Sequence, residues 1–211
     1  MNLIKKLIME RDKIGETIKL ITRSRRCVNP NWTQLDDYIE SSCDLISTKD
    51  FDKIFPDKSI LRKYPNSIQL NDINKKLSGK WCSQPFGSQS PPDFIGFEEI
   101  KNQLYIFYIE CKSGKGDKAT WNCSLPIPKP YVIYPYFNKT INKLHICSGL
   151  NLITDSEYEL LQLVMPMIRE QHSVEHLTTN WSLYIRPKWC TLQTHPDETT
   201  DIEEYIKTIV F

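Results

Sequence analysis

The sequence predicts one domain that combines helices with a β-sheet, of either the α/β or the α+β class. The chain has 211 residues, which is long enough for one substantial domain, and 40% of them are hydrophobic. Helical periodicity marks the amino-terminal segment, whereas apolar runs of strand length fill the centre of the chain. No repeat or convincing boundary divides the sequence, so we expect a single domain over residues 1–211.

The amino-terminal part predicts two helices and a shorter third one. Apolar residues recur at roughly helical spacing over residues 3–21. A break at Asn29-Pro30-Asn31 precedes a second helix over residues 32–45. Thr33 followed by Asp36 resembles a capping box, with aspartate in place of the usual Glu or Gln. A short helix is expected around residues 59–63, and residues 83–92 have the composition of a loop.

The centre of the chain predicts four strands, which cover residues 93–97, 104–111, 131–137 and 143–147. The polar residues 98–103 have the length of a hairpin loop, so we expect the first two strands to pair antiparallel. Pro135 predicts that the third strand ends or bulges there, because proline cannot donate a ladder hydrogen bond.

The carboxyl-terminal part predicts a helix that Thr154 caps and that runs through Met167, with Pro166 ending or kinking it. Helical spacing then resumes weakly to Leu177. Another strand is expected at residues 181–187. The last segment, residues 201–211, could form a helix or a strand, and its Ile-Val-Phe end slightly favours a strand.

The residues that carry chemistry lie on the central hairpin. Asp93 follows Pro91-Pro92, and Glu110-Cys111-Lys112 ends the apolar run of the second strand. Because residues i and i+2 of a strand share a face, Glu110 and Lys112 should project together while Cys111 points into the core. The hairpin should bring Asp93 close to Glu110. Two carboxylates can hold a hard divalent cation, and a lysine beside them can position a water, which predicts metal-assisted cleavage of a phosphodiester.

This arrangement resembles the PD-(D/E)XK nuclease superfamily, through Pro92-Asp93 and Glu110-Cys111-Lys112, and most of all its type II restriction endonucleases. The resemblance implies an α/β fold with a central mixed β-sheet flanked by helices, the restriction-endonuclease-like core. It implies a sequence-specific, magnesium-dependent endonuclease in which Asp93 and Glu110 hold Mg²⁺. Lys112 would orient the attacking water, and the carbonyl of Cys111, rather than its thiol, would be a further metal ligand.

The same resemblance extends to partners and to further site residues. A restriction enzyme of this size commonly acts as a homodimer on double-stranded DNA, within a restriction–modification system. The segment after the catalytic strand could contact DNA through Lys115, Lys118, Trp121 and Asn122. In the superfamily an acidic residue of the first core helix sometimes joins the metal site. Glu16 is the candidate for that role, although a glutamate on a helix is more often simply exposed to solvent.

Two other functions remain open at this point. A structure-selective, repair or nicking nuclease would use the same active site. A non-enzymatic nucleic-acid-binding protein would instead carry Asp93, Glu110 and Lys112 as a surface charge cluster. The net charge of +1 excludes a globally basic protein, so DNA binding would need positive charge gathered on one face.

The cysteines and the amino terminus predict a cytoplasmic protein. The seven cysteines are scattered and form no C-x-x-C, so neither a zinc site nor a disulfide framework is expected. His172 and His176 lack the His-Glu-x-x-His order of a zinc protease. We expect no secretory signal, and no apolar run approaches the roughly 20 residues of a membrane span.

Overall fold

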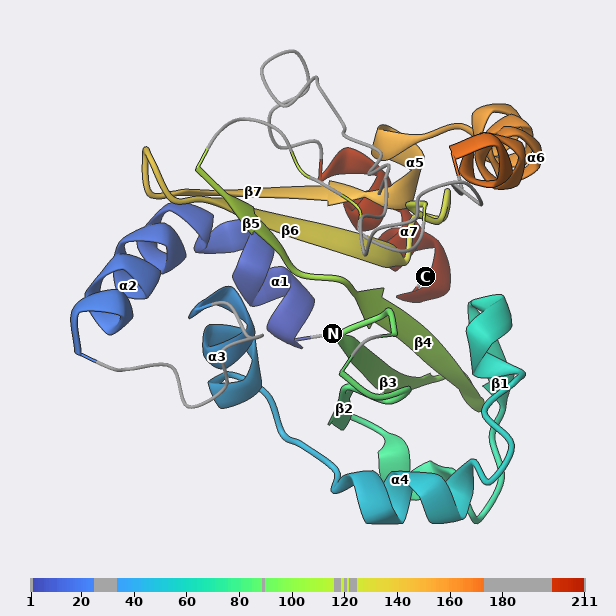
Figure 1. Cartoon of the computed structure of the whole chain (residues 1–211). Helices are drawn as coiled ribbons and strands as arrows, with labels where there is room; N and C mark the ends of the chain where they lie inside the picture. The colour runs from blue at the N-terminus through green and yellow to red at the C-terminus, as the bar shows by residue number, and fades with distance from the viewer. Residues whose placement is uncertain are drawn as a thin grey trace.

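The computed structural model describes residues 2–24, 34–88, 90–115, 119, 121, 125–172 and 199–210. Helices flank a seven-stranded mixed sheet, which confirms the predicted α/β class with a central mixed sheet (Figure 1). The strand predicted at residues 181–187 lies outside the described residues, as do Lys118 and Asn122.

The sheet contains the four predicted strands and three shorter ones. The predicted strands are β3 (Phe94–Ile100), β4 (Gln103–Ile109), β6 (Val132–Asn138) and β7 (Lys143–Ser148). The shorter ones are β1 (Ser67–Gln69), β2 (Trp81–Ser83) and β5 (Lys112–Gly114). Hydrogen bonding gives the order β2-β3-β4-β6-β5, with β1 on β4 and β7 on β6. The pairs β4·β6 and β5·β6 are parallel and the others are antiparallel.

The hairpin of β3 and β4 is tighter than the sequence predicts. Its loop is Lys101-Asn102, and both residues have positive φ, 50° and 62°. Two such residues form the type I′ turn whose twist matches that of the paired strands. The register pairs Phe94 with Ile109, so one step further along the ladder brings Asp93 opposite Glu110.

Strands β4 and β5 lie end to end along β6. Tyr108 pairs with Val132 and Lys112 pairs with Tyr136, so the register with β6 is the same for both strands. Between them, the Glu110 N–H donates to the Ile133 carbonyl at 3.0 Å. In a parallel ladder the return bond to the Glu110 carbonyl would come from the N–H of residue 135. Residue 135 is a proline and has no N–H. The prediction that Pro135 ends or bulges its own strand is therefore wrong, because β6 continues through it and the neighbouring strand is interrupted instead.

Two amino-terminal helices replace the single predicted one. α1 (Asn2–Met9) and α2 (Arg11–Ser24) meet at Glu10, and α3 (Gln34–Ser41) is shorter than the predicted helix. α2 packs on β7. The approach is close at Gly15, because a Cβ added there would lie 2.5 Å from the Asn142 carbonyl oxygen, just before β7. The three helices bury apolar faces that include Ile4, Leu7, Ile14, Ile18, Leu35 and Ile39.

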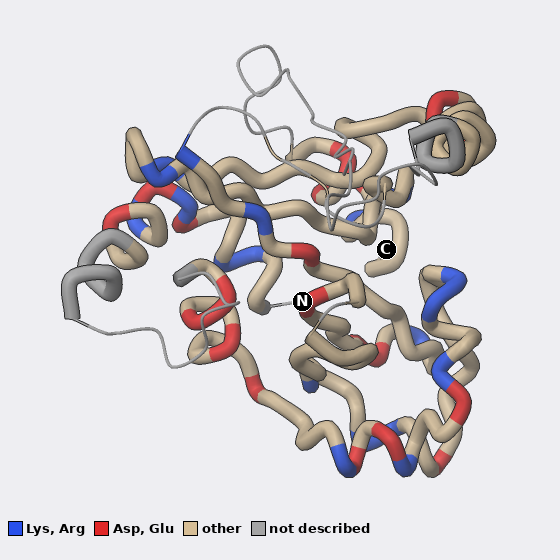
Figure 2. Tube along the Cα trace, viewed as in Figure 1, with Lys and Arg blue, Asp and Glu red and all other residues tan. Residues whose placement is uncertain are grey.

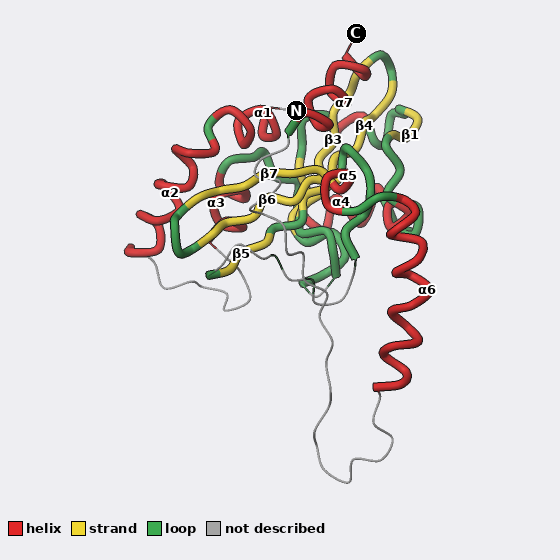
Figure 3. Tube along the Cα trace, turned by 90° about the horizontal axis from the view of Figure 1, so that it is seen from above, coloured by secondary structure: helices red, strands yellow, loops and turns green. Residues whose placement is uncertain are grey.

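The remaining helices complete the flanks of the sheet. α4 (Thr48–Ile54) packs on β2, and the short 3₁₀ turns η1 (Leu61–Lys63) and η2 (Lys75–Leu77) follow it. α5 (Gly149–Leu152) and α7 (Thr200–Val210) lie against β7. In both Figure 1 and Figure 3, α1–α3 lie to the left and α5–α7 to the right, and α6 (Asp155–His172) extends away from the sheet in Figure 3.

The carboxyl-terminal part contains two helices. Of the two alternatives for residues 201–211, the slightly favoured strand is wrong: residues 200–210 form a helix, because Ile202, Ile206 and Ile209 recur at helical spacing and are all buried. α6 continues through Pro166 to His172, in keeping with the helical spacing that resumes beyond Met167.

Within the described residues, none of the helices is long and apolar enough to cross a membrane. The described cysteines, Cys43, Cys82, Cys111 and Cys147, are free thiols.

Candidate active site

Asp93 is placed by the backbone at the start of the β3–β4 hairpin. It directly precedes β3, and its carbonyl accepts a hydrogen bond from the Gln84 N–H at 2.6 Å. Its carboxylate accepts the backbone N–H of Cys111, with Oδ2 2.6 Å from the nitrogen. The hairpin therefore brings Asp93 to the Glu110-Cys111-Lys112 segment, as the sequence predicts.

Glu110 and Lys112 form a buried ion pair. Lys112 Nζ lies 2.7 Å from Glu110 Oε1, and each side chain is only 14% exposed. The expectation that these two side chains project together is thus confirmed. The second carboxylate oxygen, Glu110 Oε2, is buried and has no hydrogen-bond partner in the described part of the chain. A buried carboxylate oxygen without a donor is a free acceptor, and it is suited to a cation or a water.

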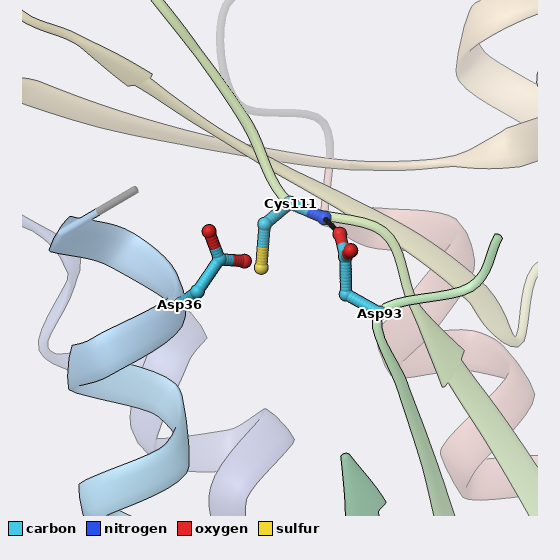
Figure 4. Close-up of side chains that lie close together, drawn as sticks. All are labelled: Asp36, Asp93 and Cys111. Atoms are coloured by element: carbon cyan, nitrogen blue, oxygen red, sulfur yellow. Dashed lines mark hydrogen bonds between the residues drawn. The ribbon is translucent and has the colours of Figure 1, made fainter. Parts of the chain in front are cut away.

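Cys111 points away from Glu110 and Lys112 and towards helix α3. It is buried in the core, as predicted, and Asp36, in the first turn of α3, lies beside its thiol (Figure 4). One carboxylate oxygen each of Asp36 and Asp93 and the Cys111 sulfur all lie within 4.8 Å of one another. Cys111 thus links two carboxylates, because its N–H binds Asp93 and its thiol hydrogen-bonds Asp36.

Burial and like charges disfavour ionisation in this group. Burial, followed by the charges of Glu110 and Asp36, raises the pKa of Asp93 to about 8, although the Cys111 N–H and Lys112 favour the ionised form. Burial, reinforced by the charges of Asp36 and Asp93, raises the pKa of the Cys111 thiol well above its usual range. At neutral pH Asp93 therefore carries a proton for much of the time, and Cys111 is a thiol and not a thiolate.

The donor set fits a hard divalent cation. Asp36, Asp93 and Cys111 offer ligand atoms close enough together to hold a metal ion. Glu110 is not part of that close group, although its Oε2 has no hydrogen-bond partner in the described part of the chain. Carboxylate oxygens suit Mg²⁺, whereas a protonated thiol does not, so the carboxylates are the expected ligands. A bound cation would also favour the ionised form of Asp93, against the burial and the like charges that raise its pKa.

Asp36 is a site residue that the sequence did not reveal as one. The sequence predicts Asp36 as part of a helix cap and offers Glu16 as the acidic candidate. Glu16 is exposed on α2, whereas Asp36 on α3 is buried and lies close to Cys111 and Asp93. The available signal was the position of Asp36 three residues before Ile39, which places a carboxylate beside the apolar face of a short helix.

The two described residues that are predicted to contact DNA, Lys115 and Trp121, differ in their exposure to solvent. Lys115 is exposed just beyond β5, where its side chain is free to reach a ligand. Trp121 is only 2% exposed, so the prediction that it contacts DNA is wrong. Its ring lies 6.0 Å from that of Tyr134, which is also buried, and 5.7 Å from Lys112 Nζ. The position of Trp121 in the sequence suggested exposure because lysines and an asparagine surround it.

Charged residues of both signs intermix over the described chain. Figure 2 shows Lys and Arg interspersed with Asp and Glu along α2 and α4. Some of these residues pair with each other, as Lys80 does with Asp44 and Lys58 with Asp52. Comparison of the chain with protein-family models, curated proteins and solved structures finds no match.

Proposed function

We propose that this protein is a magnesium-dependent endonuclease that hydrolyses phosphodiester bonds of double-stranded DNA at a specific sequence. The observation that carries the proposal is the convergence of Asp93 and Glu110 at one end of the hairpin, with Lys112 bonded to Glu110 and one Glu110 oxygen free. Two carboxylates and an amine in this arrangement are the groups that metal-assisted phosphodiester hydrolysis requires.

The carboxylates provide the metal site in this proposal. Asp93 and Glu110 would hold Mg²⁺, with the carbonyl of Cys111 as the further ligand that the family resemblance implies and Asp36 close by. The cation, when bound, polarises the scissile phosphate and lowers the pKa of its water. The thiol of Cys111 stays protonated and donates to Asp36, so its contribution is to hold that carboxylate in place.

Lys112 provides the positive charge beside the carboxylates. Its ammonium has three donors, and only one is needed for Glu110. The others are available to orient a water or to stabilise negative charge on the phosphate. Lys115, exposed beyond β5, is placed to contact the DNA backbone or a base edge. The intermixed surface charges favour a local contact of this kind over a broad basic face.

The test is cleavage of a mixed-sequence plasmid with Mg²⁺, compared with EDTA, followed by sequencing of the ends. Defined double-strand ends that appear only with Mg²⁺ are expected. Single-strand nicks, or cleavage only at branched or damaged substrates, would assign the same site to a nicking, repair or structure-selective nuclease. DNA binding without cation-dependent cleavage would contradict the proposal and favour the non-enzymatic alternative.

A further inference from the structure

We propose that Trp121 is a positioning residue that holds the ammonium group of Lys112. The expected effect on cleavage rests on the proposed function, in which Lys112 acts at the site. Lys112 Nζ lies over the Trp121 ring, 5.7 Å from its centroid. An ammonium within about 6 Å of an indole face is attracted by the ring quadrupole, and the attraction is strongest where water is excluded. Both groups meet that condition, since Trp121 is 2% exposed and the Lys112 side chain 14%.

The ring is itself held by strand β6. It packs at a tilt against Tyr134, with 6.0 Å between the ring centroids. Tyr134 is buried in β6, and its hydroxyl accepts the N–H of Ile127 at 2.7 Å. Lys112 pairs with the same strand, through Tyr136. Trp121 and Lys112 are thus positioned by one rigid element, so their contact does not depend on the ion pair with Glu110.

The indole N–H supports a role for the ring face. Trp121 Nε1 is buried and has no hydrogen-bond partner in the described part of the chain. A buried donor without an acceptor destabilises the fold, and a phenylalanine would fill much of the same space without that penalty. A tryptophan, however, offers the best ring for a cation. The arrangement is therefore suited to holding the Lys112 ammonium.

The contact has a consequence for the reaction. The stem of lysine is flexible, and Glu110 Oε1 is the other group that holds its ammonium in the described structure. A cation bound by Glu110 would compete with Lys112 for that carboxylate. The Trp121 ring, which carries no formal charge, would keep Lys112 beside the site in that state.

The first experiment tests the contact without relying on cleavage. The protein is labelled with 5-fluorotryptophan, and Trp121→Phe identifies the Trp121 resonance among those of the five tryptophans. Lys112→Met should shift this resonance, whereas the control Lys115→Met should leave it unchanged. A Trp121 resonance that is indifferent to Lys112→Met would overturn the proposal. Because Trp121 is intact in that variant, the result does not depend on how well Trp121 variants fold.

The second experiment tests the effect on the reaction by single-turnover cleavage at saturating enzyme. Trp121→Leu should slow cleavage by about tenfold, while Trp121→Phe, which keeps a ring, should stay within about threefold of wild type. DNA affinity in Ca²⁺ should be unchanged in both. Trp81→Leu is the matched control, since Trp81 is equally buried but belongs to β2, and its folded fraction should cleave at the wild-type rate. Equal loss in Trp121→Phe and Trp121→Leu would overturn the role of the ring, whereas absence of cleavage in the wild type would refute the proposed function alone.

Discussion

The acidic residues of the site are held together at an electrostatic cost. Asp36 is buried, Asp93 and Glu110 are largely buried beside it, and Lys112 is the cation that pairs with Glu110. Burial disfavours the ionised form of Asp93, and the charges of Glu110 and Asp36 add to this effect, so its pKa is raised. A divalent cation would favour the ionised forms instead. The raised pKa of Asp93 and the unpaired Oε2 of Glu110 thus both follow from the burial of several carboxylates beside one lysine.

The first prediction concerns Asp93→Asn, which should abolish cleavage and leave DNA binding in Ca²⁺ largely intact. It should also stabilise the metal-free protein at high pH. The pKa of Asp93 is raised from 3.8 to about 8, so its stabilising contribution is complete below pH 4 and is lost as the pH rises towards 8. The amide of the variant mimics the protonated carboxyl group. Relative to wild type, the free energy of unfolding should therefore gain little at pH 4 and about 1–3 kcal/mol at pH 9.

Urea unfolding in EDTA at both pH values measures this gain. Asp155→Asn, at an exposed carboxylate on α6, is the control and should show no such pH dependence. A gain of equal size at pH 4 and pH 9 would mean that Asp93 is not the titrating group, and wild-type cleavage in Asp93→Asn would remove it from the metal site.

The second prediction concerns Cys111→Ser. The serine keeps the backbone N–H that binds Asp93 and an O–H that can donate to Asp36. With Mg²⁺ its single-turnover cleavage should stay within about threefold of wild type, because the thiol is not a ligand of a hard cation. Isothermal titration with Mg²⁺ should give similar affinities for both proteins. Loss of cation binding in Cys111→Ser would show instead that sulfur belongs to the metal site.

The third prediction separates the two lysines at the end of the β4–β5 line. Lys112→Ala should lose most single-turnover cleavage, since this ammonium lies beside the carboxylates. Lys115→Ala should mainly weaken binding or relax sequence choice, because its side chain is exposed beyond β5 and can meet phosphates or bases. Binding is measured in Ca²⁺ over a range of salt concentrations. An inactive Lys115→Ala beside a fully active Lys112→Ala would show that Lys112 is not the catalytic lysine.

At the scale of elements, Pro135 opens the sheet where the site lies. Because it offers no N–H to the Glu110 carbonyl, the line formed by β4 and β5 is interrupted at Glu110 and Cys111. The interruption coincides with the two residues whose backbone and side chains serve the site: Cys111 gives its N–H to Asp93, and Glu110 binds Lys112. Pro135 therefore lies where regular strand pairing would compete with the contacts that Glu110 and Cys111 make in the site.

The fourth prediction tests that account with Pro135→Val. The new N–H should pair with the Glu110 carbonyl and close the ladder, so the amide of residue 135 should exchange slowly with solvent. The added hydrogen bond and the lost rigidity of proline have opposite effects, so the free energy of unfolding should change by no more than about 1 kcal/mol. Cleavage should fall, because Glu110 is drawn into the regular strand. Fast exchange at residue 135 would contradict the account.

The sequence revealed local patterns well and tertiary proximity poorly. The central strands were predictable from β-branched and aromatic runs, and the pairing of Asp93 with the Glu110-Cys111-Lys112 segment was predictable because one short hairpin joins them. Asp36 could not be placed, since its approach to Cys111 depends on how α3 packs on the sheet. Residues 200–210 were misassigned because Ile-Val-Phe favours a strand locally, whereas burial of three isoleucines on β7 favours a helix.

At the scale of the whole molecule, the proposed function raises the question of how both strands of a duplex would be cut. The described residues hold one group of carboxylates with ligand spacing, at the junction of α3 with the β3–β4 hairpin. One such group cuts one strand at a time. A two-fold symmetric dimer would present two equal sites to the two strands of a palindrome, and the two cuts would then be equivalent.

The fifth prediction follows from this symmetry. Bound to its cognate DNA in Ca²⁺, the protein should sediment with two chains of 24.8 kDa each, after the mass of the DNA is subtracted. In Mg²⁺ the fragments should have identical, symmetric ends, because each chain cuts one strand at the same distance from the dyad. An equimolar mixture of wild type with Asp93→Asn provides the control, since mixed dimers should nick one strand and stop. A single chain on DNA that nicks only one strand would contradict the dimer and favour the nicking nuclease.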